Sequence, residues 1–198
     1  MHAKPRLPIL PYQLIADRDG AAAVEFALIF PVMFTLFMGS IEITNLMMAN
    51  LKTTAATEAA SDLLAQTRAS ANTSTKTTLD GYNAAAGMIM SPLSTTGLKL
   101  AFASITFDAA GTPSVAWHYE ENSASAITTA SLDSNTLRNL LENTTTPTSD
   151  SVVMVKATYV YSSPISFVLG TSYTFTDIAY NHPRYVPAVA CTNCAVGG

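Results

Sequence analysis

The longest apolar run of the chain lies near its N-terminus, from Ala21 to Met48, where Glu25 and Glu42 are the only charged residues. Between these two acids, residues 26–41 read FALIFPVMFTLFMGSI. As an α-helix this run would be about 24 Å long, whereas a bilayer core is about 30 Å thick and needs about 20 residues. The pattern therefore predicts a membrane-spanning helix that also includes residues 21–24, so that Glu25 lies inside the membrane.

Helical spacing continues beyond this run. One row at spacing four is apolar or small, a second such row lies beside it, and the opposite row is polar. The three rows are Met47, Leu51, Ala55, Ala59 and Leu63; Met48, Ala56, Ala60 and Leu64; and Asn50, Thr54, Glu58, Asp62 and Gln66. We predict one helix from Ala21 to about Thr67, roughly 70 Å long. Its outer apolar stripe is expected to face the chain's own C-terminal domain or sister subunits.

Strand patterns follow in the second half of the chain. Residues 98–107 and 114–119 flank the loop DAAGTP, which predicts a hairpin, while 151–161 and 171–180 are further strand candidates. Shorter elements are predicted as a polar linker at 68–81, a helix within 82–92, and a helix within 131–143 that carries Leu137, Leu140 and Leu141 on one face. The predicted fold class is α+β, with a long N-terminal transmembrane helix that continues outside the membrane and a mainly antiparallel β-sheet domain.

Composition argues against several classes of function. Charged residues make up 12% of the 198 residues, about half the usual share of roughly 25%, and the net charge is −4 with no basic run. Nucleic-acid binding is therefore not expected. Of the three histidines only His118 lies beside carboxylates, and with Glu120 it could form an acid/base or metal corner; we favour a solvated strand end. Without a nucleophile, phosphate-binding or dinucleotide motif, we predict no enzyme, no cofactor, no metal and no small-molecule substrate.

The flanks of the apolar run favour one orientation. Lys4, Arg6 and Arg18 precede it, whereas only Lys52 follows it before Glu58, so the N-terminus is predicted to be cytoplasmic. The segment has three interpretations. It is a secretory signal that is cleaved off, a signal anchor that is never cleaved, or a membrane-spanning helix whose chain is cleaved just before the helix begins. The apolar core is too long and the sequence MMANLK is too poor a cleavage site to favour the first.

The third interpretation uses Gly20 and Glu25 together. An acidic side chain costs roughly 2.5–3.5 kcal/mol at the bilayer centre and less near an interface, so it is usually paired or functional. A cut after Gly20 would make Ala21 a new N-terminus with a protonatable amine. On a neighbouring subunit that amine could pair with Glu25, which is the fifth residue of the product. The alternative is a glutamate that snorkels to the headgroups.

This region resembles a known family. Gly20, a short apolar stretch, Glu25 and Phe26 are similar to the cleavage region of type IV prepilins and pseudopilins, and the string RDGAAAVEFALIFPVMFTLFMGSIEI more narrowly resembles the TadE-like family of the tight-adherence (Flp) pilus system. Pro31 and Glu42 belong to this resemblance. The C-terminal sequence HPRYVPAVAC resembles the same family more weakly. Ala21 departs from the Phe of many prepilins, which bears on N-methylation more than on cleavage.

The resemblance implies a minor pilin or pseudopilin that a prepilin peptidase cuts between Gly20 and Ala21. It divides the chain into a cytoplasmic leader at 1–20, a transmembrane and amphipathic helix at 21–70, and a periplasmic or extracellular α+β domain at 71–198. The implied partners are the peptidase, other pilins, the assembly platform and the lipid of the bacterial inner membrane, with the pilus as the later location. The alternative is an unprocessed, single-pass anchored interaction domain in the periplasm.

Pro31 and the two cysteines remain. Pro31 frees the carbonyl of Ala27, so it predicts either a kink or local melting on packing, or an ordinary proline of a membrane helix. Cys191 and Cys194 form the sequence CTNC. We favour a disulfide in an oxidising compartment over zinc or thioredoxin-like chemistry. Free thiols, or a link from these cysteines to a lipid or a partner, stay open.

Overall fold

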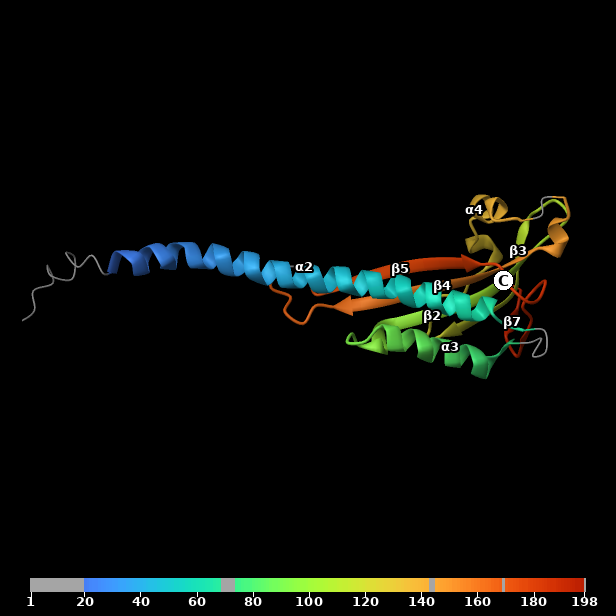
Figure 1. Ribbon diagram of the computed structural model, residues 1–198, viewed down its shortest axis with the longest axis horizontal. Helices are drawn as coiled ribbons and strands as arrows, with labels where there is room; N and C mark the ends of the chain where they lie inside the picture. The colour runs from blue at the N-terminus through green and yellow to red at the C-terminus, as the bar shows by residue number, and fades with distance from the viewer. Residues whose placement is uncertain (1–19, 69–73, 143–144, 169, 198) are drawn as a thin grey trace, which may run out of the picture.

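The computed structural model describes residues 20–68, 74–142, 145–168 and 170–197. It confirms the α+β class: a long helix, α2 (Ala21–Ala65), precedes a five-stranded antiparallel sheet with the order β5-β4-β2-β3-β7 (Figure 1). The strands of this sheet are β2 (Leu98–Phe107), β3 (Pro113–Glu121), β4 (Ser151–Ser162), β5 (Ser172–Asn181) and β7 (Ala195–Val196). Two short strands, β1 (Ser74–Thr75) and β6 (Cys191–Thr192), pair in parallel. The predicted leader at 1–20 lies outside the described residues apart from Gly20.

The remaining helices correct two predictions. Helix α3 (Lys76–Ile89) begins where a polar linker was predicted, because Thr75 caps it: the Thr75 hydroxyl accepts a hydrogen bond from the Thr78 N–H at 3.3 Å. Since α3 buries only Leu79 and Ala86, its helical periodicity is weak in the sequence. Helix α4 (Ser134–Asn139) lies within the predicted range 131–143, but it ends before Leu140 and Leu141, which were predicted to share its face with Leu137. Single 3₁₀ turns lie at Thr95–Gly97, Thr129–Ser131 and Pro147–Ser149.

Each face of the sheet carries a core. Helices α2 and α3 cover one face, and the segment that includes α4 covers part of the other (Figure 1). Strand β4 belongs to both cores. Its predicted inward face, Val153, Val155, Ala157, Tyr159 and Tyr161, is buried toward the helices. Val152 and Met154 are buried in the second core, so the first half of β4 is covered on both sides and not on one side as predicted.

On the outer half of α2, one of the two predicted apolar rows is confirmed as facing the chain's own domain, because Ala56, Ala60 and Leu64 are buried. The row that contains Met47 and Leu51 faces away from the sheet, with these two side chains 61% and 67% exposed. The buried side consists mostly of small residues: Ala49, Thr53, Ala56, Thr57, Ala60, Ser61, Leu64 and Ala65. Thr53 and Thr57 donate hydrogen bonds to the carbonyls of Ala49 and Thr53 at 2.8 and 2.7 Å, so buried hydroxyls are satisfied within the helix. Small side chains let α2 lie close to the sheet.

The C-terminal segment fastens the end of α2. The Arg184 N–H donates to the carbonyl of Ala65 at 2.9 Å, and the Arg184 guanidinium pairs with Asp62. The Asn181 amide donates to the Ser61 hydroxyl at 3.1 Å. These contacts give the HPRY sequence a structural role at the helix terminus, where backbone carbonyls otherwise lack partners. Both ionic side chains of the pair are substantially exposed, so the backbone contacts matter more than the charge pair.

Gly97, directly before β2, lies close to the backbone of β4. A Cβ at this position would lie 2.5 Å from the carbonyl oxygen of Val160. We expect Gly97→Ala to force a backbone shift and to destabilise the domain by about 1–3 kcal/mol. Gly81→Ala is the matched control, because no atom lies within 4 Å of its Cβ position in α3 and the change should be neutral or stabilising. Thermal melts of both full-length variants in detergent test this; equal melting temperatures would contradict it.

Candidate membrane anchor and processing seam

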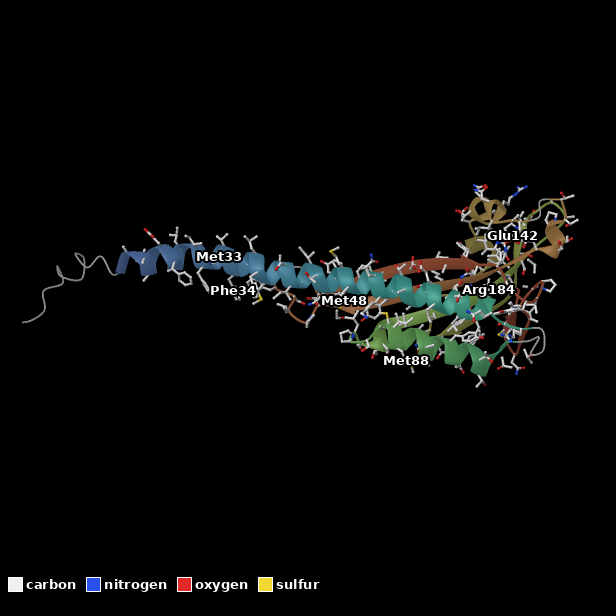
Figure 2. All side chains as sticks on the ribbon, viewed as in Figure 1. Met33, Phe34, Met48, Met88, Glu142 and Arg184 are labelled. Carbon is white, nitrogen blue, oxygen red and sulfur yellow. A yellow bond between two sulfur atoms is a disulfide. The ribbon has the colours of Figure 1, made fainter. Side chains whose placement is uncertain are left out.

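The first third of α2 extends away from the sheet domain, and its side chains are uncovered (Figures 1 and 2). Every residue from Ala21 to Phe37 is exposed, including Leu28 at 79% and Leu36 at 69%. Among the described residues, α2 is the one helix that is long and apolar enough to cross a membrane. An apolar rod of this size is not stable in water, so the arrangement indicates a membrane anchor.

Polar groups within the anchor bond back to their own helix. The hydroxyls of Thr35, Ser40 and Thr44 donate to the carbonyls of Pro31, Phe37 and Ser40, each at 2.8 Å. Such bonds satisfy hydroxyl donors where no water is present. Helix α2 is continuous through Pro31. A kink that forms on packing with other helices therefore stays a prediction.

The predicted cleavage seam lies where α2 begins. Gly20 directly precedes the first helical residue, Ala21, and is exposed, with no atom within 4 Å of its Cβ position. Glu25 lies one turn into the helix, on the same face as Ala21 because the two are four residues apart. It is exposed and lies close to the first residue that the structure describes. The structure thus keeps the three residues together and accessible; cleavage and pairing remain predictions.

An apolar groove extends the exposed surface of the anchor along the domain. Thr44, Met47, Met48, Leu51, Lys52, Ala55 and Ile89 line a groove of about 520 Å³ between α2 and the end of α3, which we name the outer groove. Lys52 is the one charged residue among the described residues that line this groove, and its ammonium group donates a hydrogen bond to the carbonyl of Ile89 at 3.0 Å. The apolar surface of α2 therefore does not stop at the membrane boundary.

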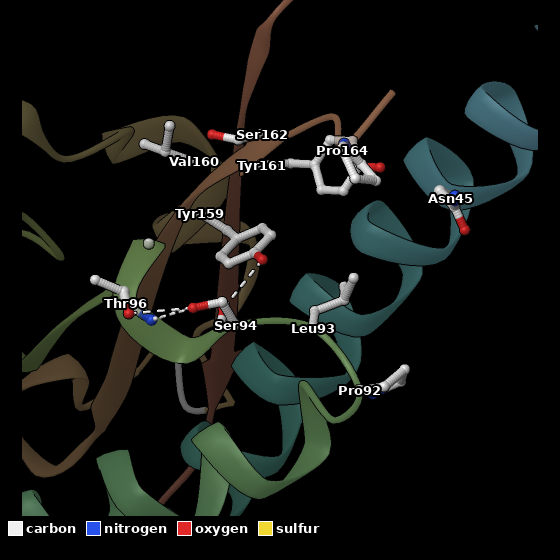
Figure 3. A pocket seen from close by; sticks show the side chains of 11 residues that line it. Asn45, Pro92, Leu93, Ser94, Thr96, Tyr159, Val160, Tyr161, Ser162 and Pro164 are labelled. Carbon is white, nitrogen blue, oxygen red and sulfur yellow. Dashed lines mark hydrogen bonds between the residues drawn. The ribbon is translucent and has the colours of Figure 1, made fainter. Parts of the chain in front are cut away.

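A second pocket, of about 620 Å³, lies between α2 and the end of β4 (Figure 3). The Tyr159 hydroxyl donates to the carbonyl of Ser94 at 3.0 Å, while the Tyr161 hydroxyl is buried without a hydrogen-bond partner. The lining residues are apolar, hydroxyl-bearing or amide-bearing, without an acid or a base. This geometry supplies no proton-transfer pair.

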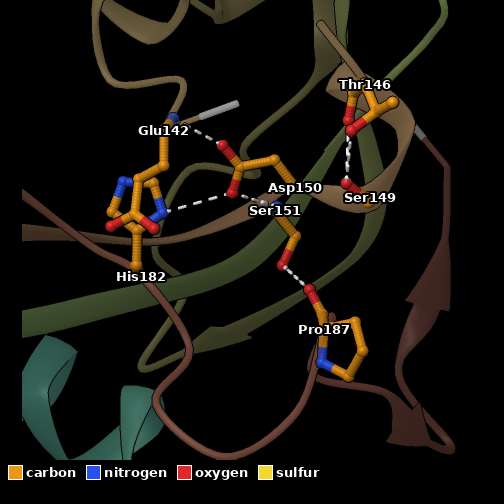
Figure 4. Close-up of polar contacts among 7 residues, drawn as sticks. All are labelled: Glu142, Thr146, Ser149, Asp150, Ser151, His182 and Pro187. Carbon is orange, nitrogen blue, oxygen red and sulfur yellow. Dashed lines mark hydrogen bonds and ion pairs between the residues drawn. The ribbon is translucent and has the colours of Figure 1, made fainter. Parts of the chain in front are cut away.

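Two histidine–carboxylate pairs lie in the domain. His118 pairs with Glu120 through Nδ1 on β3, and the two side chains are 15% and 26% exposed, so they are less solvated than the strand end that the sequence favoured. His182 lies 3.4 Å from Asp150, whose carboxylate also accepts the N–H groups of Glu142 and Ser151 at 2.8 and 2.9 Å (Figure 4). The Ser151 hydroxyl donates to the carbonyl of Pro187 at 2.6 Å and so is not directed at His182. Within the described ranges no cluster of three metal-ligating side chains occurs.

Hydrogen bonds and burial shift the pKa of three groups in the domain. The Thr112 N–H, with that of Ala110, lowers the pKa of Asp108 in the turn between β2 and β3. The Thr136 hydroxyl and N–H lower the pKa of Asp133 at the start of α4. Burial raises the pKa of Tyr119, which donates to the carboxylates of Asp80 and Glu121. These groups order turns and the α3–β3 contact.

Cys191 and Cys194 form a disulfide that closes the tail between β6 and β7. Asn193 occupies the left-handed region at φ 66°, which asparagine tolerates within such a turn. The tail is held independently, since the Trp117 indole N–H donates to the carbonyl of Val189 at 2.7 Å.

Reducing this disulfide is expected to change the melting temperature little. The ring is short, so its contribution should be smaller than the roughly 3 kcal/mol of a 15-residue loop. Melts of the oxidised chain, the reduced chain and a Cys191→Ser/Cys194→Ser variant measure the effect. A large drop, or a thiol-sensitive dimer on gels, would instead indicate a link between chains.

Sequence analysis missed the role of Glu42. Its side chain is 1% exposed, and its carboxylate accepts the N–H groups of Phe167 and Val168, residues more than a hundred positions away. The signal that could have drawn attention to it is a second acid at the outer end of an apolar run. Nothing local indicates its partner.

Comparison with known families agrees with this anchor. Residues 20–62 match the family model described as TadE-like protein, which confirms the predicted resemblance over the segment that contains the seam, the anchor and most of α2. The match supports involvement in the tight-adherence (Tad) pilus system. No curated protein and no solved structure matches the chain.

Proposed function

We propose, from its TadE-like segment, that this chain is a minor pilin or pseudopilin that takes part in assembly of a tight-adherence pilus after a prepilin peptidase cuts it behind Gly20. The observation that carries the proposal is the protruding apolar helix, which begins at the residue after Gly20 and bears Glu25 one turn in. Within the part of the chain that the structure describes, Gly20 and Glu25 are exposed, which supports access for a peptidase and a neighbouring subunit.

The anchor has two roles in succession. Before assembly it holds the chain in the inner membrane, with the N-terminus in the cytoplasm and the sheet domain in the periplasm. After the cut, the amine of Ala21 pairs with Glu25 of an adjacent subunit inside the helix bundle. The outer groove, with Met47 and Leu51 exposed, extends the surface along which other pilins pack.

Four partners follow from this scheme. They are the prepilin peptidase, other pilins or pseudopilins, the assembly platform, and the lipid of the inner membrane. Neither a cofactor nor a small-molecule substrate is needed, because the proposed work is done by helix packing and charge pairing. After assembly, the chain would be found in the pilus outside the cell.

The mature N-terminus tests the proposal most directly. Intact mass and N-terminal sequencing of the chain from piliated cells should give a product that starts at Ala21. A product that retains the leader would contradict processing and would favour the alternative, an unprocessed anchored interaction domain in the periplasm. N-methylation would appear in the same spectrum as one added methyl group on Ala21.

A further inference from the structure

The loop between β4 and β5 is unusually apolar for an exposed segment. Residues 163–168 read SPISFV, and no charged residue occurs between Lys156 and Asp177. Ile165, Phe167 and Val168 are 41%, 56% and 47% exposed. Isolated exposed apolar side chains are ordinary, but a contiguous group at one end of a domain indicates a partner surface.

This loop lies beside the anchor and not beside the sheet. The rings of Phe34 and Phe167 meet edge to face with centroids 5.8 Å apart. A Cβ on Gly39 would touch the Val168 side chain at 3.6 Å. If the span begins at Ala21, about 20 residues of helix reach Ser40 at the outer edge of the bilayer. Phe34 lies six residues before Ser40, or about 9 Å deeper. Phe167 therefore reaches the depth at which interfacial apolar side chains insert, about 5–10 Å.

Glu42 satisfies the backbone of this loop. Its carboxylate accepts the Phe167 N–H and, at 3.1 Å, the Val168 N–H. Unpaired N–H groups are costly in a medium without water, and a buried carboxylate likewise needs donors. The pairing meets both needs: the N–H groups of Phe167 and Val168 face the helix, while the side chains of Ile165 and Phe167 stay 41% and 56% exposed.

We propose that residues 163–168 of the β4–β5 loop form a second membrane contact of this protein, which inserts Ile165 and Phe167 into the interfacial layer of the bilayer, and that Glu42 is the positioning residue of this contact. The partner is lipid, at the boundary of glycerol and upper acyl chains. Continuity with the anchor and the lack of charge favour lipid over a water-facing protein partner. Two contacts fix the height and rotation of the domain on the membrane, whereas a single helix would leave it free to swivel. The inference rests on membrane anchoring and not on the proposed processing or pilus role.

Depth-dependent quenching of tryptophan tests the contact. Ile165→Trp and the matched control Ile178→Trp place the probe at two positions that are each 41% exposed, the control on β5 near Thr54 and Glu58 of α2. The native Trp117 is buried in the domain and gives a constant background. The full-length chain is placed at low density in phosphatidylcholine vesicles that carry bromine near the top or near the middle of the acyl chains.

We expect the emission added by Ile165→Trp to be mostly lost in vesicles brominated near the top of the chains and less affected by bromine near the middle. Ile178→Trp should remain as bright as in unbrominated vesicles. Equal emission of Ile165→Trp with and without bromine would overturn the proposal, whether water or a second protein copy covers the loop. No peptidase or pilus takes part, so this failure is distinct from failure of the proposed function.

Glu42→Gln in the Ile165→Trp chain tests the positioning role. An amide keeps one acceptor oxygen and turns its NH₂ toward a backbone N–H, so the loop should detach and the quenching should fall to near the control value. Glu58→Gln, at an exposed position of the same helix, should leave quenching unchanged. A thermal melt verifies that the domain stays folded. Unchanged quenching in Glu42→Gln would show that Glu42 does not position the loop.

Discussion

Gly20→Val is expected to leave the chain as a precursor about 2 kDa heavier than the mature protein, because 198 residues weigh 20.9 kDa and the leader is residues 1–20. A peptidase must draw the backbone at the seam into an extended conformation within its own site. Gly20 has no Cβ to obstruct that approach, whereas valine adds a branched side chain at the scissile bond and stiffens its backbone. Immunoblots and intact mass of the membrane fraction measure the result.

The matched control for this variant is Gly81→Val. Gly81 likewise has no atom within 4 Å of its Cβ position, but it lies in α3, far from the seam in sequence. It should mature to the wild-type size. If Gly20→Val also matures to the wild-type size, the assignment of the cleavage site is wrong. If neither chain accumulates, a melt of each variant in detergent separates misfolding from failed processing.

The sequence predicted those elements whose patterns are local and strong. The helix was predicted from Ala21 to about Thr67 and extends from Ala21 to Ala65, slightly short of the segment boundary at residue 70. The hairpin of β2 and β3 and the alternation in β4 were also predicted, because strand periodicity and a turn between two runs are readable without knowledge of the fold. The TadE-like resemblance, confirmed over residues 20–62, rests on contiguous residues in the same way.

Hydrophobicity could not predict which of the two apolar rows on the outer half of α2 faces the sheet; the row with Ala56, Ala60 and Leu64 does. Large apolar residues such as Met47 and Leu51 appeared to be the natural core row, yet they are exposed. The sheet instead contacts alanines and threonines, because close approach of a helix to a sheet selects small side chains. Threonine hydroxyls that bond to their own helix no longer need water. The large residues remain outside, where the outer groove lies.

The residues of the candidate site also differ in whether the sequence alone can indicate them. Gly20, Ala21 and Glu25 could be proposed from the sequence because they lie within six consecutive residues, and their roles stay predictions. Glu42 was noticed only as the second acid of the apolar run and as part of the TadE-like resemblance. Its partners Phe167 and Val168 come from a loop that no periodic pattern marks. Contacts across more than a hundred residues depend on the docking of α2 against β4 and β5, which only the folded chain reveals.

Glu25→Ala is expected to give a processed, stable protein that stays in the membrane fraction, with few or no pili. Cleavage depends on the seam at Gly20, so the variant should still mature. Removing the carboxylate should ease residence in lipid by part of the roughly 2.5–3.5 kcal/mol that an acid costs at the bilayer centre. Assembly should fail, because the amine of Ala21 would enter the bundle unpaired and breaking a buried ion pair costs about 3–5 kcal/mol. Mass spectrometry measures processing, and blots of sheared surface fractions measure piliation.

Two control variants separate the effect of the Glu25 charge from the effect of changing the helix surface around it. Val24→Ala trims the neighbouring side chain, itself 68% exposed, and keeps the carboxylate, so piliation should be near normal. Glu25→Asp retains the charge on a shorter side chain and should recover part of the pili that Glu25→Ala loses. Normal piliation in Glu25→Ala would mean that the carboxylate only snorkels to the headgroups. The anchor would then hold the domain at the membrane without guiding subunits into a filament, and the unprocessed anchor would become the better account of α2.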